Sequence, residues 1–323
     1  MTEALKAFMA AMIDYAGLFP PAGLGMAESV RNYLEYRQSP ERWMLGRFLC
    51  PVGRLDELSG RLREHVEPLS LSVILTPVAA TEEYLARLEK DARVLREFLR
   101  RQTGAVQLQM IETRAPAEVI AIGEAGAVEA FLDYTAEILK AAGLPPVPVF
   151  HEVGFPADWR QSTAAYIEGL GQYNAGREEL RFIPAGFKMR CGGLEPSDFP
   201  EAEQVAFAVG QCRDAAVPMK ATAGLHHPVR GRDPKLNVAT HGFLNVFGAI
   251  LLSGKHSLDE TLVREILEED NPASFRFIEN SFAWKEWQVD VDEIRELREA
   301  LGVSFGSCSF DEPRDDLRDL GLL

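Results

Sequence analysis

Two lysines follow short apolar runs in the second half of the chain. Lys188 ends the run Ile183–Lys188, and Lys220 ends the run Val217–Lys220. Between them, apolar residues recur three and four apart over Val205–Ala216, which is typical of an amphipathic helix. A strand, helix, strand unit makes its two strands parallel, so we expect both lysines at the carboxyl edge of one sheet, where α/β proteins bind ligands.

Two lysines at such an edge suggest carbonyl chemistry. A lysine that is desolvated or close to a second cation loses its proton more readily, and its amine then attacks a carbonyl to form a Schiff base. A shift of the lysine pKa from about 10.4 to near 7 corresponds to roughly 4–5 kcal/mol. Asp133, Glu112 or Glu152 would shuttle protons. The opposing hypothesis pairs Lys188 and Lys220 with Asp133 and Glu152 in a buried ionic layer.

Short apolar segments alternate with helical patterns from residue 41 onward. The predicted strands are Leu45–Cys50, Leu69–Leu75, Ala105–Ile111, Val128–Leu132, Val147–Phe150, Ile183–Lys188, Val217–Lys220 and Phe275–Ile278, with Val303–Cys308 as a ninth candidate. The predicted helices are Leu55–Glu64, Thr81–Arg101, Pro116–Gly123, Thr135–Ala142, Asp158–Tyr173, Pro200–Ala215, Asn237–Leu252 and Leu258–Glu268. Alternation of this kind predicts a parallel sheet covered by helices.

Eight such units predict a closed (β/α)8 barrel, an α/β fold. We expect one domain over residues 1–323, with 1–40 as an N-terminal helical segment and 41–323 as the barrel. An open doubly wound sheet is the alternative, although the first predicted strand ends in Cys50-Pro51-Val52-Gly53 and not in the glycine-rich turn of a dinucleotide site. The pair Asp14-Tyr15, beside the rigid turn LFPPAGLG, is interpreted as a helix cap or as part of a lid.

The segments that follow the predicted strands carry further polar groups. Arg190 or Arg230 would anchor an anionic substrate, because a guanidinium binds carboxylates and phosphates through paired hydrogen bonds. The other residues expected to contact substrate at this mouth are Thr222, His226, Ser307 and Cys308. The expected partner of such a barrel is a small molecule. If the barrel catalyses no reaction, it would be a small-molecule-binding protein, which is a further alternative.

The segments GFKMRCGG and PMKATAGLHHPVR resemble the sixth and seventh strands of the deoxyribose-phosphate aldolase group of class I aldolases. The resemblance covers residues 182–230 and implies a barrel lyase with Lys188 as the Schiff-base lysine, Lys220 as its pKa-lowering partner and Asp133 as the proton relay. It departs from that group at Met189-Arg190-Cys191 and at Leu225-His226-His227. His151 and Glu152 stand where the group has a lysine on its fifth strand.

Three further stretches, DYAGLFPPA, KATAGLHHP and SFGSCSFDEP, resemble signatures of a barrel family of bacterial and plant proteins. That resemblance implies no activity.

A metal site is the alternative to lysine chemistry. Two histidines and a carboxylate, here His151, Glu152 and His226, would hold zinc, manganese or iron in a lyase, isomerase or hydrolase. However, the chain lacks the usual spacing of metal ligands on one helix or strand, and His226-His227 point to opposite sides of an extended segment. The favoured expectation is therefore an enzyme without a cofactor, and a divalent metal is the alternative.

Composition limits the partners of the protein. The formal charge is 34 − 49 = −15, which argues against nucleic acid and anionic membranes as main partners. The chain has no apolar run of about 20 residues and no signal-peptide pattern, so a cytoplasmic location is expected. Its four cysteines form no C-x-x-C pair. Because barrels often associate, a homo-oligomer is also expected.

Overall fold

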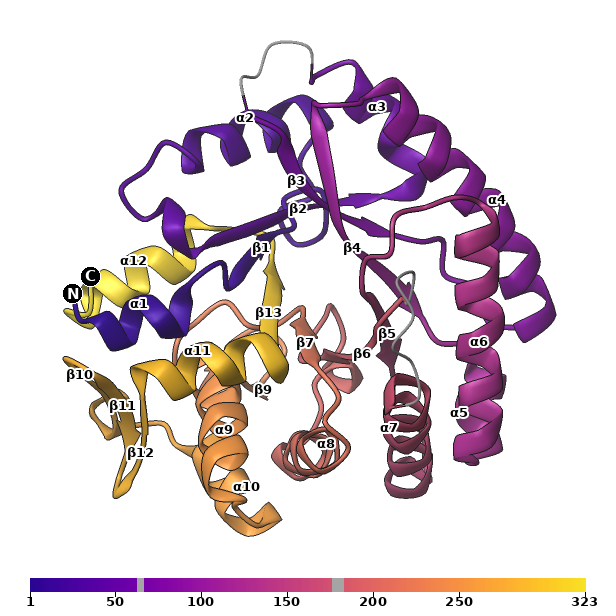
Figure 1. Cartoon of the computed structure of the whole chain (residues 1–323). Coiled ribbons are helices and arrows are strands. Elements are labelled where there is room, and N and C mark those ends of the chain that lie inside the picture. The colour runs from indigo at the N-terminus through magenta and orange to yellow at the C-terminus, as the bar shows by residue number, and fades with distance from the viewer. Residues whose placement is uncertain (63–66, 176–182) are drawn as a thin grey trace. The chain divides into compact units, whose positions relative to one another are not determined.

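Eight parallel strands form a closed barrel, which confirms the predicted (β/α)8 fold (Figure 1). The computed structural model describes residues 1–62, 67–175 and 183–323. The order of the strands around the barrel is β1-β13-β7-β6-β5-β4-β3-β2. Among the described residues, no helix is both long and apolar enough to cross a bilayer.

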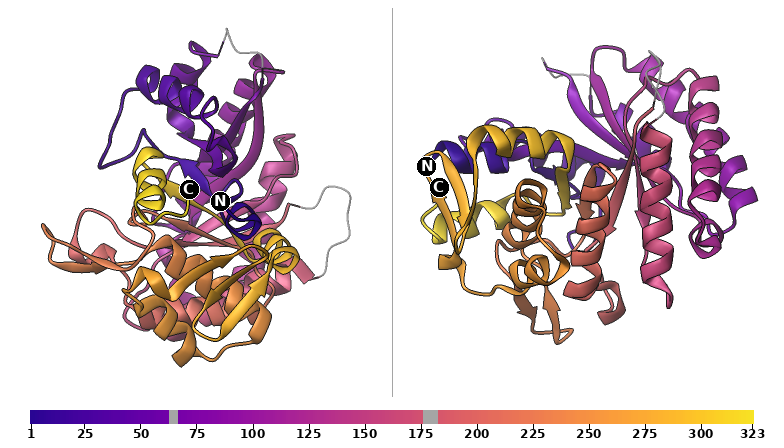
Figure 2. Two further views of the ribbon diagram at one scale, coloured as in Figure 1. Left: turned by 90° about the vertical axis from the view of Figure 1, so that its left-hand side faces the viewer. Right: turned by 60° about the horizontal axis from the view of Figure 1, so that its bottom comes forward.

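The chain divides into two compact units, which are described separately. The first unit contains Met1–Tyr15, Tyr36–Gly46 and Met189–Leu323, and the second contains Ala16–Glu35 and Arg47–Lys188. Both chain termini belong to the first unit, where they lie next to each other (Figure 1 and Figure 2).

The first unit carries three barrel strands, β1 (Ile13–Tyr15), β7 (Met219–Thr222) and β13 (Gly302–Ser307), and the end of β6 (Ala185–Arg190). Its helices are α1 (Glu3–Met9), α8 (Ala202–Asp214), α9 (Phe243–His256), α10 (Glu260–Glu268), α11 (Val291–Ala300) and α12 (Asp311–Asp319), with short 3-10 turns at Arg42–Met44, Pro196–Asp198 and Pro272–Ser274. A hairpin of β8 (Gly231–Asp233) and β9 (Val238–Thr240) and a sheet of β10 (Phe275–Ile278), β11 (Ser281–Trp284) and β12 (Trp287–Asp290) complete it.

In this unit, strand β13 pairs in parallel with β1 on one side and β7 on the other. Asp14 lies opposite Gly306, and Ser304 lies opposite Lys220. The C-terminal strand therefore brings the N-terminal segment next to the strand that carries the second lysine. Helix α1 packs on the small sheet, where the ring of Phe8 contacts Phe277 and Phe282.

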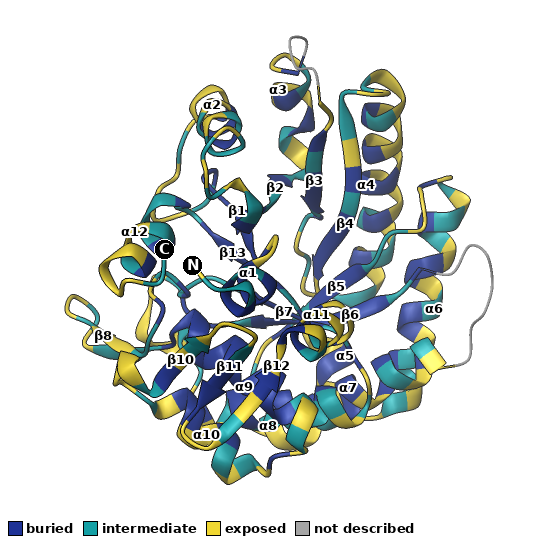
Figure 3. Cartoon of the chain, turned by 60° about the vertical axis from the view of Figure 1, so that its left-hand side comes forward, coloured by how far each residue is buried: buried dark blue, intermediate teal, exposed yellow. Residues whose placement is uncertain are grey.

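The second unit carries β2 (Leu45–Pro51) from Arg47 onward, β3 (Leu69–Ile74), β4 (Val106–Arg114), β5 (Val149–Val153) and the start of β6. Its helices are α2 (Met26–Tyr36) up to Glu35, α3 (Leu55–Ser59), α4 (Thr81–Arg101), α5 (Ala117–Ile122), α6 (Ala125–Ala141) and α7 (Trp159–Ala175), with a 3-10 turn at Val52–Arg54. Helices α6 and α7 pack against each other (Figure 1). The strands are buried while the outer helix faces are exposed (Figure 3).

Helical periodicity explains where the predictions for this unit succeed and fail. Helix α4 has the predicted bounds, because its buried residues, among them Tyr84, Leu88 and Leu95, recur three and four apart. The predicted strand Val128–Leu132 is wrong, since Val128, Phe131 and Leu132 lie on the buried face of α6. A short apolar run suits a buried helix face as well as a strand. The end of the predicted helix Leu55–Glu64 lies partly outside the described residues.

The predicted barrel strands of the first unit differ from the observed ones at two places. Ile13–Tyr15 is the barrel strand β1, so Asp14 is not a helix cap, and the N-terminal segment is not purely helical. The predicted strand Phe275–Ile278 exists, but it belongs to the small antiparallel sheet, and β13 is the barrel strand at the C-terminus. The predicted helix Asn237–Leu252 begins only at Phe243, because Val238–Thr240 forms β9.

Two glycines allow inward side chains to fit. A Cβ atom at Gly186 would collide with the ring of Phe150, and one at Gly46 would collide with the carboxylate of Asp14. On β6, Gly186 therefore leaves room for Phe150, and two residues further Lys188 lies on the same face of the strand.

Candidate functional site

Lys188 lies between two carboxylates on neighbouring strands. Its Nζ is 3.0 Å from Glu112 Oε2 on β4 and 3.0 Å from Glu152 Oε2 on β5. The side chains of Lys188 and Glu112 are 5% and 0% exposed, whereas that of Glu152 is 13% exposed. One ammonium and two carboxylates give this cluster, which we call the Lys188 cluster, a net charge of −1.

Ser72 on β3 completes the Lys188 cluster. Its hydroxyl donates a hydrogen bond of 2.7 Å to Glu112 Oε1, so the two oxygens of Glu112 face different partners. A carboxylate that accepts a hydroxyl and contacts an ammonium is held in one orientation. Glu112 is therefore fixed, while Glu152 is the carboxylate of the cluster that retains access to solvent.

The carboxylates decide the protonation of Lys188. Burial by itself lowers the pKa of Lys188, but the charges and hydrogen bonds of Glu112 and Glu152 outweigh burial, and the pKa is raised above the ordinary value for lysine. The amine is thus an ammonium ion at neutral pH. The expectation of a lowered lysine pKa is not met here, and the Lys188–Glu152 contact expected of a buried ionic layer is present.

Lys220 on β7 belongs to a second group, which we call the Lys220 cluster. Its Nζ contacts Asp14 Oδ2 on β1 and donates to Ser304 Oγ on β13 at 3.2 Å, and Ser304 in turn donates to Asp14 Oδ2 at 2.7 Å. The side chains of Lys220 and Asp14 are 0% exposed. The sequence analysis did not identify Asp14 and Ser304 as partners of Lys220, since these strands meet only when the barrel closes.

Asp133 does not occupy the predicted position after a strand. It lies within helix α6, half-buried, because the predicted strand before it is part of that helix. Glu112 on β4, which precedes α6, and Glu152 on β5, which follows it, supply the carboxylates next to Lys188. The prediction that Asp133 ends a barrel strand is therefore wrong.

The predicted substrate-binding residues fall at the carboxyl ends of β6, β7 and β13 or just beyond them. Arg190 is the last residue of β6 and pairs with Asp198 at 3.7 Å. Thr222 ends β7, and its carbonyl accepts a hydrogen bond of 2.8 Å from the backbone of Cys191. Ser307 ends β13 and is buried, and the half-buried Cys308 follows it.

The buried cysteines are unsuited to nucleophilic catalysis. Burial raises the pKa of Cys50 and of Cys191 to about 12 and that of Cys212 well above its ordinary value. A thiol of this kind stays protonated at neutral pH, and only the thiolate is a good nucleophile.

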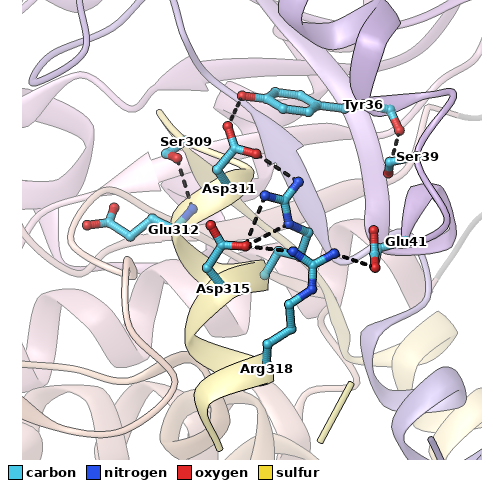
Figure 4. Close-up of polar contacts among 9 residues, drawn as sticks. Tyr36, Ser39, Glu41, Ser309, Asp311, Glu312, Asp315 and Arg318 are labelled. Carbon is cyan, nitrogen blue, oxygen red and sulfur yellow. Dashed lines mark hydrogen bonds and ion pairs between the residues drawn. The ribbon is translucent and has the colours of Figure 1, made fainter. Parts of the chain in front are cut away.

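His226 and His227 both contact helix α12. Nδ1 of His226 is 2.9 Å from Glu312 Oε2, and Nδ1 of His227 is 2.7 Å from Asp316 Oδ2. Figure 4 shows other contacts of this helix, where the Tyr36 hydroxyl donates to Asp311 and Arg318 pairs with Glu41 at 2.6 Å. These pairs are partly exposed, so they link α12 to the rest of the first unit but each adds little to stability.

The three residues of the metal alternative have other surroundings. His151 points to the opposite face of β5 from Glu152, where its ring packs near Phe131 and Tyr166. Burial lowers its pKa to about 3. His226 pairs with Glu312, as described above. Within residues 1–62, 67–175 and 183–323, no group of three or more His, Cys, Asp or Glu side chains is arranged to hold a metal ion.

The chain is thus a (β/α)8 barrel with a buried lysine–carboxylate cluster in each unit. No protein-family model and no curated protein sequence matches it. Among solved structures, it is similar to the tetrameric deoxyribose phosphate aldolase from Aeropyrum pernix, with 14% identity and a TM-score of 0.45 over 69% of this chain and 80% of that chain. A GH6 enzyme from Orpinomyces sp. Y102 has 10% identity and a TM-score of 0.36 over 94% of this chain and 100% of the other. Similarities this weak carry no information about activity.

Proposed function

We propose that this protein is an enzyme that processes small carbonyl compounds through a Schiff base on Lys188. The observation that supports the proposal is the pair of carboxylates, each 3.0 Å from Nζ, on the two strands that precede β6 in the chain. A buried lysine with a single role in stability needs one counter-ion, whereas Schiff-base formation also needs a group that takes up and returns protons.

The proton balance of the reaction suits this cluster. The ammonium of Lys188 first transfers a proton to Glu152, which leaves the net charge of −1 unchanged. The free amine then attacks the carbonyl carbon, and the resulting carbinolamine loses its oxygen as water after Glu152 returns the proton. The iminium ion carries the same positive charge as the original ammonium, so Glu112 and Glu152 stabilise both.

The two carboxylates would have separate roles in this scheme. Glu112, fixed by Ser72 and fully buried, remains ionised and holds the cation in place. Glu152 is partly exposed and would act as the proton shuttle, and later as the base that removes a proton from a substrate hydroxyl when a carbon–carbon bond breaks. Lyase chemistry of the class I aldolase type is the form of the reaction that we favour, and it needs no cofactor.

The remaining predicted residues belong to the same proposal. Lys220, the electrostatic partner that the aldolase resemblance implies, is paired with Asp14 and would have a structural role in this scheme, while Arg190 or Arg230 would bind an anionic group of the substrate. We assign contacts with the substrate to Thr222, His226, Ser307 and Cys308. A small molecule is the proposed partner, and a cytoplasmic homo-oligomer is the proposed form of the protein.

Reductive trapping tests the proposal directly. The full-length protein is incubated with small aldehydes and ketones, phosphorylated and not, in the presence of cyanoborohydride, and adducts are located by intact mass and peptide mapping. We expect an adduct on Lys188 in the wild type and none in Lys188→Arg, which keeps the positive charge between the carboxylates but forms no Schiff base. The peptide with Lys140, a lysine on α6 paired with Glu137, reports non-specific reduction.

The raised pKa of Lys188 favours a second candidate, a small-molecule-binding barrel without turnover in which the Lys188 cluster only stabilises the fold. That candidate predicts equal labelling of Lys188 and Lys140 or no labelling of either. Either result would replace the Schiff-base proposal.

A further inference from the structure

Arg114 lies on the same face of β4 as Glu112. Side chains alternate between the two faces of a strand, and the hydroxyl of Thr113, between these two residues, donates to the hydroxyl of Tyr84 on α4 at 3.1 Å. Thr113 therefore faces the helices, whereas Glu112 and Arg114 face the side on which Lys188 lies. The Cα atom of Arg114 is about 6–7 Å further toward the carboxyl end of the strand than that of Glu112.

The pairing of β4 with β5 places Arg114 beside Glu152. The two residues are Cα partners in the parallel register (Figure 1). The backbone N–H of Ala115 donates to the carbonyl oxygen of Glu152 at 2.9 Å, so the pairing continues past Arg114. Since the carboxylate of Glu152 contacts Lys188, Arg114 lies next to the Lys188 cluster, toward the carboxyl ends of the strands.

The side chain of Arg114 is exposed, and its guanidinium forms no ion pair in the described parts of the chain. Glu152, its neighbour on β5, contacts the ammonium of Lys188 instead. Unlike Arg190 and Arg230, which belong to the first unit, Arg114 lies in the same unit as Lys188. An anion from solvent therefore has access to a positive charge near the lysine.

The charge of the Lys188 cluster itself opposes an anion next to the reacting carbonyl. Glu112 and Glu152 each lie 3.0 Å from Nζ of Lys188, and the cluster has an excess of negative charge. A carboxylate attached directly to the carbonyl carbon would lie close to both, and like charges repel strongly in a buried site. An anion further along the substrate avoids this repulsion and reaches Arg114.

We infer that the anionic group of the substrate is separated from the carbonyl by two or three carbons, and that Arg114 binds this group. A chain of this length, with bonds of about 1.5 Å, spans the offset of about 6–7 Å along β4 together with one hydrogen bond. The guanidinium offers paired N–H donors, which suit carboxylate and phosphate oxygens alike. The substrate class is thus the 4-oxo and 5-oxo acids or their phosphate counterparts, and not the 2-oxo acids.

This inference rests on the proposed Schiff base, so adducts on the Lys188 peptide are its readout. Levulinate and 3-oxobutylphosphonate, two anions of the stated chain length, are compared with the neutral levulinamide, and pyruvate is compared with pyruvamide. Each compound is trapped with cyanoborohydride on the full-length protein at pH 7. A short lysine peptide in the same reaction corrects for the intrinsic reactivity of each carbonyl.

Two preferences are expected in the wild type. Levulinate or 3-oxobutylphosphonate should form the adduct at least about tenfold faster than levulinamide, and the faster of the two identifies the anion as carboxylate or phosphate. Pyruvate should form it at least about tenfold more slowly than pyruvamide, because its carboxylate is repelled by Glu112 and Glu152.

Substitutions assign each preference to its cause. Arg114→Gln should abolish the preference for the anionic probes, whereas Arg93→Gln, which removes an exposed arginine of α4, should keep it. Glu112→Gln retains an acceptor for Ser72 and removes one negative charge, so it should reduce the penalty on pyruvate. Because each preference is a ratio measured within one variant, a general loss of reactivity does not imitate it.

Several results would overturn the inference. They are equal rates for levulinate, 3-oxobutylphosphonate and levulinamide in the wild type, a preference that persists in Arg114→Gln, an equal loss in Arg93→Gln, and pyruvate that reacts as fast as pyruvamide. In each case the adduct on Lys188 still forms, so the proposed function stands. If no probe gives an adduct on Lys188, the proposed function fails and this inference fails with it.

Discussion

The Lys188 and Lys220 clusters place similar groups in different surroundings. Both contain a buried lysine, at least one carboxylate and a serine that donates to a carboxylate at 2.7 Å. The Lys188 cluster has two carboxylates, one of them 13% exposed, and a net charge of −1. The Lys220 cluster joins its lysine to Asp14, both fully buried, and is neutral as a pair.

This difference indicates that Lys188 is suited to a catalytic role and Lys220 to stabilising the fold. A proton that leaves Lys188 has an acceptor in Glu152, and a second carboxylate remains to hold a cation. A proton that leaves Lys220 for Asp14 would abolish the buried ion pair that links β7 to β1. Substitutions in the two clusters should therefore have different effects.

The largest expected effect concerns Glu152. If the proton of Lys188 moves to Glu152 within the site, the rate of reductive trapping in the wild type should change little between pH 6 and pH 9. Glu152→Gln should lower the rate at pH 7 by about 10²–10⁴-fold, the usual contribution of a general acid–base group. Glu112 still contacts the ammonium of Lys188 in the variant, so the proton must leave to water and the variant's rate should rise about tenfold per pH unit.

Glu137→Gln, an exposed substitution on α6, serves as the control for this experiment. A wild-type rate that itself rises tenfold per pH unit would mean that the proton leaves to water. That result would remove the proposed distinction between the clusters.

Next in size is the loss of stability on removing each ammonium. Lys220→Met removes the ammonium beside the fully buried carboxyl group of Asp14, and we expect it to lower the free energy of unfolding by about 3–5 kcal/mol. Lys188→Met should cost less, about 2 kcal/mol, because protonation of the partly exposed Glu152 would keep the net charge of the site at −1 while Ser72 still donates to the buried Glu112. Urea unfolding at pH 7 measures both values.

A double substitution provides the control. Asp14→Asn combined with Lys220→Met should recover more than half of the loss, since no uncompensated charge remains. If Lys188→Met proves as costly as Lys220→Met, the exposure of Glu152 is not what separates the clusters.

The smallest effect compares the two serines. Ser304 donates to Asp14 and accepts from Lys220, whereas Ser72 donates to Glu112. Ser304→Ala should therefore lower the free energy of unfolding by about 2 kcal/mol and Ser72→Ala by about 1 kcal/mol. Ser70→Ala, which removes only a neutral contact with Gln109, should cost less than either. Equal values for Ser304 and Ser72 would show that the bond to Lys220 adds nothing.

Much of the fold was predictable because periodicity depends on local sequence. Strands β2, β3 and β6 are short apolar runs bounded by turn residues, and helix α4 repeats its buried face over 21 residues. Strand β1 has three residues and adjoins a helix, so its pattern does not differ from a helix end. The segment Val128–Leu132 is apolar on one face of α6, and this mimics a strand when fewer than two helical turns are considered.

The candidate site, like the fold, was predictable only in part. Lys188, Lys220 and Glu152 were identified from the sequence, because a charged residue that ends an apolar strand is conspicuous and parallel strands deliver such residues to one edge. Glu112 was also named as a possible proton shuttle, but the partners of Lys220 were not identified. Asp14 is 206 residues from Lys220 along the chain, and Ser304 is 84 residues from it.

The sequence by itself thus determined the barrel class, the positions of the two lysines in the strand order and the excess of negative charge. Only the tertiary structure decided that Lys188 has two carboxylates and a raised pKa, that Asp133 belongs to a helix, and that Lys220 pairs with the N-terminal strand. The physical reason is that periodicity reports the burial of each segment, whereas the pairing of buried charges depends on which distant strands become neighbours when the barrel closes.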